Sequence, residues 1–108
     1  METISRDEAR ELINADCDLT VVEVLDEPNY QEFHLPGAIN VPVDKKFDEN
    51  ILIAVPDKRR TVLLYCLHAE CPAAQEAGER MAQLGYEDVL AYEAGKVDWK
   101  EAGLPVET

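Results

Sequence analysis

The sequence has few basic residues and no long apolar run. Ten Lys and Arg residues stand against 23 Asp and Glu residues, and the formal net charge is −13 at pH 7. Nucleic acid is therefore an unfavourable partner, because binding to its phosphate backbone needs clustered cations, and the basic clusters at 45–46 and 58–60 have acidic neighbours. No segment reaches the roughly 18 apolar residues of a membrane span, and the N-terminus lacks the pattern of a secretory signal. We expect a cytoplasmic protein that binds no membrane.

Cysteine is scarce as well. Three cysteines, an odd number without an export signal, argue against a disulfide framework and for reduced thiols. Cys66, His68 and Cys71 lie in one segment, but the sequence nominates no fourth ligand for a zinc site. We therefore expect neither a metal nor a cofactor.

The apolar content is sufficient for one compact core. Hydrophobic residues make up 46% of the 108 residues, and they are spread along the whole chain without an internal repeat, a low-complexity segment or a linker. A chain of this length supports one hydrophobic core and is too short for two. We expect residues 1–108 to form a single domain.

Short apolar segments alternate with segments of helical periodicity. Ser5 and Glu8 form a capping box that begins a first helix. Strands are expected at 20–25, 39–41, 61–65 and 89–92, and further helices at 27–33, 47–53, 72–84 and 97–102. Pro72 is expected as the first helical residue. This alternation predicts an α/β fold with a central parallel sheet, helices on both faces, and a site at the C-terminal ends of the strands.

Cys66 is the candidate nucleophile, because it follows the predicted strand 61–65 and precedes a turn and a helix N-terminus. Backbone N–H groups of such a turn and the positive end of the helix dipole favour a thiolate. We expect Cys66 to be the most reactive thiol, and Cys17 to react slowly because the carboxylates of its neighbours disfavour a thiolate. The predicted cradle around Cys66 consists of Leu67, His68, Ala69, Glu70 and Cys71.

The polar residues of this turn leave alternatives open. His68 either assists proton transfer at Cys66 or is an exposed turn residue. Cys71 either attacks a modified Cys66 as a resolving thiol or is a bystander. Glu70 disfavours an anion and is expected to face solvent.

Several segments together resemble the rhodanese-like domain family. The matching stretches are VVEV at 21–24, FHLPGAINVP at 33–42, LYC at 64–66, LGY at 84–86, AG at 94–95 followed by Trp99, and AGLPV at 102–106. The resemblance implies a rhodanese-like α/β domain in which Cys66 carries a persulfide. It also implies a sulfur donor, such as a persulfide, a polysulfide or a small sulfane-sulfur compound, and a thiol or protein as acceptor.

The active-site loop departs from the family pattern. Family members active on thiosulfate usually end this loop with a basic residue, where the sequence has Cys71, followed by Pro72. The family's Asp-x-Arg appears as Glu23-Val24-Leu25, which lacks the Arg. Without a cation, thiosulfate should bind poorly.

The resemblance also assigns structural roles. The family's loop-end side chain is directed at the rim of the site, so we expect Cys71 to be a bystander. His34 matches a family position and is expected to form a hydrogen bond within a turn. Independently of the resemblance, Tyr92 and Trp99 are expected in the core, because aromatic side chains dominate core burial.

The leading interpretation is a sulfurtransferase that is weak on thiosulfate. Two alternatives are a non-catalytic rhodanese-like module that binds a partner protein, and a thiol redox role for Cys66 and Cys71.

Overall fold

The computed structural model describes residues 1–15 and 18–108. Five parallel strands form one sheet in the order β1-β5-β4-β2-β3. The strands are β1 (Glu2–Ile4), β2 (Leu19–Glu23), β3 (Ile39–Asn40), β4 (Thr61–Tyr65) and β5 (Val89–Tyr92). The helices are α1 (Arg6–Ala15), α2 (Glu27–Glu32), α3 (Phe47–Ala54), α4 (Ala73–Gln83) and α5 (Gly95–Glu101). The expected α/β fold is confirmed.

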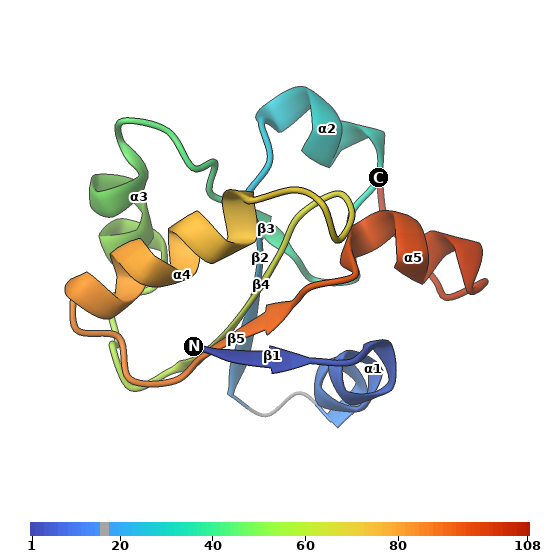
Figure 1. Cartoon of the computed structure of the whole chain (residues 1–108), viewed down its shortest axis with the longest axis horizontal. Coiled ribbons are helices and arrows are strands. Elements are labelled where there is room, and N and C mark those ends of the chain that lie inside the picture. Colours follow the sequence, from blue (N-terminus) through green and yellow to red (C-terminus); the bar gives the residue numbers. More distant parts are fainter. Residues whose placement is uncertain (16–17) are drawn as a thin grey trace.

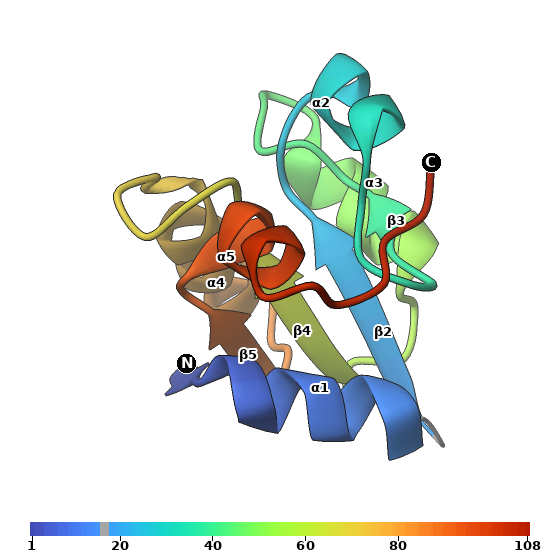
Figure 2. The same ribbon diagram turned by 90° about the vertical axis from the view of Figure 1, so that its right-hand side faces the viewer.

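The two faces of the sheet bury separate apolar clusters. Helices α3 and α4 cover the face that carries Val22 and Leu64, whereas α1 and α5 cover the face that carries Val21 and Leu63 (Figure 1). Successive side chains of a strand point to opposite faces, so a strand covered on both sides is apolar throughout. Figure 2 shows α1 crossing one end of the strands and α5 lying over β4 and β5. None of the described helices is long and apolar enough to cross a bilayer.

The N-terminal capping box is confirmed by its hydrogen bonds. The Glu8 backbone N–H donates to Ser5 Oγ at 3.2 Å, and the Ser5 backbone N–H donates to Glu8 Oε1 at 3.1 Å. The sequence reasoning missed β1, which precedes this box and pairs with β5 from Glu2 opposite Leu90 to Ile4 opposite Tyr92. A three-residue strand carries little periodicity of its own, and pairing with β5 is what makes it a strand.

Apart from β4 and β5, the predicted elements differ from the structure by one or two residues at one or both ends. The strand expected at 20–25 is β2, which ends at Glu23. Pro72 is not the first helical residue, because α4 begins at Ala73 and the Pro72 carbonyl accepts the first helical hydrogen bond, from the Glu76 N–H at 3.0 Å. Helix α5 begins two residues earlier than expected, at Gly95.

The structural roles expected for the aromatic residues and for His34 are confirmed. Tyr92 and Trp99 are buried in the cluster under α1 and α5, and Trp99 Nε1 donates to the Pro105 carbonyl at 2.7 Å. His34 Nδ1 lies 2.9 Å from the Tyr30 carbonyl oxygen, and the two rings stack with centroids 3.9 Å apart. His34 also pairs with Glu107 in an antiparallel bridge that fastens the C-terminal tail.

Candidate functional site

The site is centred on Cys66, which follows β4 at the C-terminal edge of the sheet and is 2% exposed. The Cys66 carbonyl accepts the backbone N–H of Lys96 at 3.0 Å, and the Leu67 carbonyl accepts that of Val97 at 3.1 Å. These bonds use N–H groups in the first turn of α5 that have no partner inside that helix. The start of the loop is therefore held by α5.

Gly95 permits this close contact between the loop and α5. Its φ of +85° is in the left-handed region, and a Cβ atom there would lie 2.5 Å from the Leu67 carbonyl oxygen and 2.6 Å from the His68 nitrogen. Any larger residue would force the loop away from the helix.

Cys71 is bonded to Cys66 in a disulfide. The expectation that the Cys71 side chain points at the rim, away from the nucleophile, is therefore wrong, and so is the expectation of reduced thiols for Cys66 and Cys71 in this structure. The Cys71 N–H donates to the His68 carbonyl at 3.1 Å, and this turn folds the chain back so that the two Cα atoms are 6.3 Å apart. That separation lies within the range that a disulfide spans.

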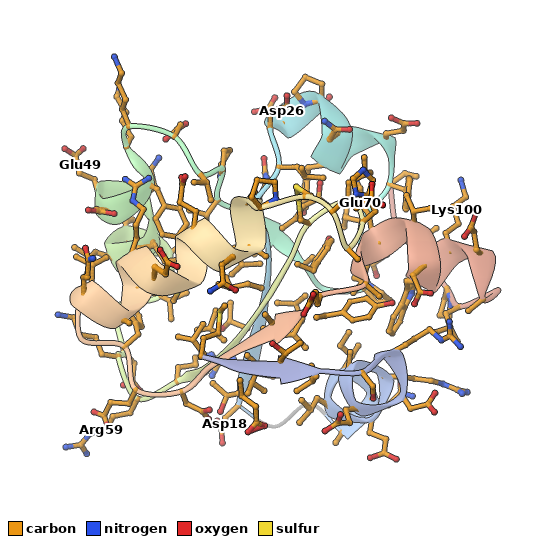
Figure 3. The ribbon with its side chains drawn as sticks, in the orientation of Figure 1. Asp18, Asp26, Glu49, Arg59, Glu70 and Lys100 are labelled. Carbon is orange, nitrogen blue, oxygen red and sulfur yellow. A yellow bond between two sulfur atoms is a disulfide. The ribbon has the colours of Figure 1, made fainter. Side chains whose placement is uncertain are left out.

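The other loop residues are more open. Leu67 packs against the cluster under α3 and α4, whereas His68, Ala69 and Glu70 are exposed, as expected for Glu70 (labelled in Figure 3). The His68 side chain forms no hydrogen bond with any described residue, which agrees with the exposed-turn alternative. Within the described part of the chain the backbone N–H groups of 67–70 also have no acceptor. They are free to hydrogen-bond to a bound anion or to water.

A cavity of about 160 Å³ opens beside the disulfide. Both cysteines line it, together with the exposed carboxylates of Glu70 and Glu93. No lysine or arginine among the described residues lines this cavity, so its charge is negative. Sequence reasoning missed Glu93, which directly follows β5. The C-terminal ends of β4 and β5 lie at the same edge of the sheet.

A buried ion pair lies at the end of β2, two residues before the position at which the family has an Arg and this chain does not. Lys96 Nζ lies 3.0 Å from Glu23 Oε2 and also donates to the carbonyls of Asn29 and Phe33, each at 2.6 Å. The Tyr65 hydroxyl donates to Glu23 Oε1 at 2.7 Å. Burial, followed by the charge of Glu23, raises the pKa of Tyr65 well above its ordinary value, so the hydroxyl stays a donor.

Sequence reasoning missed Lys96 as the partner of Glu23. The available signal was Glu23 itself, because a carboxylate in an otherwise apolar strand needs a facing donor. Leu25, at the position of the missing Arg, instead packs against the apolar cluster under α3 and α4. The pair joins β2 to α5, and its lysine is the residue whose backbone N–H holds the Cys66 carbonyl.

Comparisons with known proteins agree with this architecture. A model of the rhodanese-like domain matches residues 5–102. Thiosulfate sulfurtransferase PspE of Escherichia coli is 38% identical over 68 residues, which cover 63% of this chain and 62% of PspE. An HTH-type transcriptional regulator of Mycobacterium tuberculosis is 34% identical over 90 residues, which cover 83% of this chain and 38% of the regulator. The chain thus spans less than two thirds of either relative.

Solved structures share the fold. The BH2092 protein from Bacillus halodurans superimposes with a TM-score of 0.84 at 26% identity, covering 98% of this chain and 76% of that protein. A rhodanese with anions from Escherichia coli superimposes with a TM-score of 0.67 at 32% identity, covering 83% of this chain and 98% of that chain.

Proposed function

Since the chain belongs to the rhodanese-like domain family, we propose that it is a sulfurtransferase in which Cys66 carries sulfane sulfur as a persulfide. The observation that carries the proposal is the position of Cys66 at the end of β4, beside a cavity and ahead of four backbone N–H groups without an acceptor in the described chain. N–H groups in such a turn and a following helix N-terminus stabilise negative charge on sulfur.

The proposed reaction begins from the reduced dithiol, because the nucleophile is a thiolate and the sulfur of Cys66 is not one while it is bonded to Cys71. The Cys66 thiolate attacks the outer sulfur of a donor R–S–SH. A bond forms between Cys66 Sγ and that sulfur, the donor's S–S bond breaks, and RS⁻ leaves with the electron pair. An acceptor thiolate then attacks the outer sulfur and regenerates the Cys66 thiolate.

The charge and size of the cavity favour particular sulfur donors. Thiosulfate is a dianion, and the carboxylates of Glu70 and Glu93 oppose it without a cation on the cavity wall. A persulfide, a polysulfide or a small sulfane-sulfur compound is therefore the proposed donor, and a thiol or a protein the acceptor. A cavity of about 160 Å³ is smaller than sites for drug-sized ligands, so it takes the reacting end of the donor.

A second candidate function is thiol–disulfide exchange, which the Cys66–Cys71 disulfide favours. A non-catalytic module that binds a partner protein through the same loop is the remaining alternative. It is supported by the acidic cavity and by Pro72, which removes one backbone donor.

Mass spectrometry of two matched variants tests the proposal. Reduced Cys71→Ser protein, treated with an organic hydropersulfide, is expected to gain about 32 Da as a persulfide on Cys66. The added sulfur should leave on addition of excess thiol, and Cys66→Ser protein should gain none. A Cys71→Ser protein that takes up no sulfur at Cys66, or takes it up at Cys17 instead, contradicts the proposal.

A further inference from the structure

We propose that Cys71 is the resolving thiol for the Cys66 persulfide, so that the protein reduces sulfane sulfur to sulfide. The inference rests on the proposed function in one respect, the uptake of sulfur by Cys66. It goes beyond that function because the outer sulfur leaves as sulfide and is not handed to an acceptor.

Backbone hydrogen bonds hold both ends of the loop, so that the sulfur atoms of Cys66 and Cys71 lie next to each other. The Cys66 carbonyl is bonded to the N–H of Lys96, and the Cys71 N–H is bonded to the carbonyl of His68. Neither hydrogen bond involves the sulfur atoms, so reduction of the disulfide removes none of their donors or acceptors. With Cα atoms 6.3 Å apart, the thiols of the reduced protein lie within bonding reach of each other.

The resolving step balances without an external oxidant. The Cys71 thiolate attacks Cys66 Sγ, the inner sulfur of the persulfide. A Cys66–Cys71 bond forms, the bond from Cys66 Sγ to the outer sulfur breaks, and the outer sulfur leaves as HS⁻ with the electron pair. The sulfane sulfur is reduced by two electrons, and the two cysteine thiols are oxidised to the disulfide seen in the structure.

Proximity favours Cys71 over an external acceptor. A tethered group acts at an effective concentration of about millimolar even on a short flexible linker, and at far higher values when it is positioned. At millimolar thiol or below, release of sulfide should therefore precede transfer to an acceptor.

The disulfide must then be reduced by two equivalents of a low-molecular-weight thiol. Cys71 is partly exposed, whereas Cys66 is buried, so the reductant attacks the sulfur of Cys71 and Cys66 leaves as the thiolate. A second thiol attacks the mixed disulfide on Cys71, and the products are the dithiol protein and one small-molecule disulfide.

A single-turnover experiment tests the inference. The 108-residue protein is reduced, freed of reductant without oxygen, and mixed with one equivalent of an organic hydropersulfide. Sulfide is trapped with bimane, and its amount is corrected for a protein-free blank. Wild type should lose about 2 Da through a Cys66–Cys71 disulfide and release about one sulfide per disulfide. Cys71→Ser should keep the Cys66 persulfide on the order of tenfold longer or more and release little sulfide. Cys71→Ala is a second variant that controls for an effect specific to serine. Circular dichroism checks that both Cys71→Ser and Cys71→Ala are folded.

The possible results distinguish a failure of this inference from a failure of the proposed sulfurtransferase function. A wild-type persulfide that lasts as long as that of Cys71→Ser, or a disulfide formed without sulfide, overturns the inference and leaves Cys66 as a sulfur carrier. A Cys66→Ser protein that takes up sulfur on Cys71 reverses the two roles and also overturns it. If Cys71→Ser takes up no sulfur at all, the proposed function fails, and the inference fails with it.

Discussion

Lys96 Nζ lies 3.0 Å from Glu23 Oε2, and the two side chains are 1% and 0% exposed. Two further carbonyl oxygens and the Tyr65 hydroxyl complete the hydrogen bonds of the pair. Lys96 also donates its backbone N–H to the Cys66 carbonyl. One residue therefore both neutralises the carboxylate that ends β2 and holds the start of the Cys66 loop.

Removing the lysine charge should be strongly destabilising. Lys96→Met leaves the Glu23 carboxylate buried and without a cation, and loss of one partner of a buried pair costs about 3–5 kcal/mol. Adding Glu23→Gln to Lys96→Met should recover part of that loss, because no buried charge remains. Urea denaturation of both variants measures the free energies of unfolding.

The control is the pair of Arg6 and Asp98, which lies 3.1 Å apart with side chains 43% and 35% exposed. Arg6→Met should cost less than about 1 kcal/mol, because water solvates the remaining carboxylate. Equal losses of unfolding free energy in Lys96→Met and Arg6→Met would contradict the conclusion that burial makes the Lys96–Glu23 pair costly to break.

Two glycines with left-handed backbone offer a matched comparison. Gly103→Ala, with φ +79° and no atom near the added Cβ, should cost about 1–2 kcal/mol from conformation alone. Gly95→Ala adds a clash with the Leu67 carbonyl and should cost more. It should also change the alkylation rate of Cys66 in reduced protein, whereas Gly103→Ala should not. Identical stabilities and alkylation rates would show that the loop does not depend on contact with α5.

Thiosulfate:cyanide sulfurtransferase activity should be weak and should rise when Cys71 is replaced by Arg. The guanidinium would supply the cation that the acidic cavity lacks and would pair with the dianion. Cys71→Ser is the control, because it also removes the disulfide and adds no charge. Wild-type activity equal to that of efficient sulfurtransferases, or no gain of Cys71→Arg over Cys71→Ser, would show that another feature sets the substrate range.

Stability should fall as the pH rises above about 10, the ordinary pKa of tyrosine. Burial is the largest cause that raises the pKa values of Tyr30, Tyr65, Tyr86 and Tyr92 in the folded protein. Unfolded tyrosines lose their protons first, so their contribution to stability is complete below that pH and is lost above it. In a pH titration of the folded protein, tyrosinate absorbance should rise together with loss of the circular dichroism signal. In protein unfolded by urea, the absorbance should rise near pH 10. Full ionisation near pH 10 with an unchanged circular dichroism signal would contradict this expectation.

Local sequence signals sufficed for much of the fold. The capping box of Ser5 and Glu8 and the bounds of β4 and β5 follow from side chains close in sequence, and the structure confirms them. The place of Cys66 at a strand end and the loop without a cation were also readable from the sequence. The reactivity expected for Cys17 lies outside the described residues and stays a prediction.

Tertiary structure decided the remaining features, because each depends on groups far apart in the chain. Glu23 and Lys96 are 73 positions apart, and only the pairing of β2, β4 and β5 brings their side chains together. The direction of Cys71 depends on a turn whose first residues are hydrogen-bonded to α5, and β1 exists through its pairing with β5. The sequence by itself determined which residues could do chemistry at the sheet edge. Packing determined which of them meet, because burial and hydrogen bonding select one arrangement of the loop.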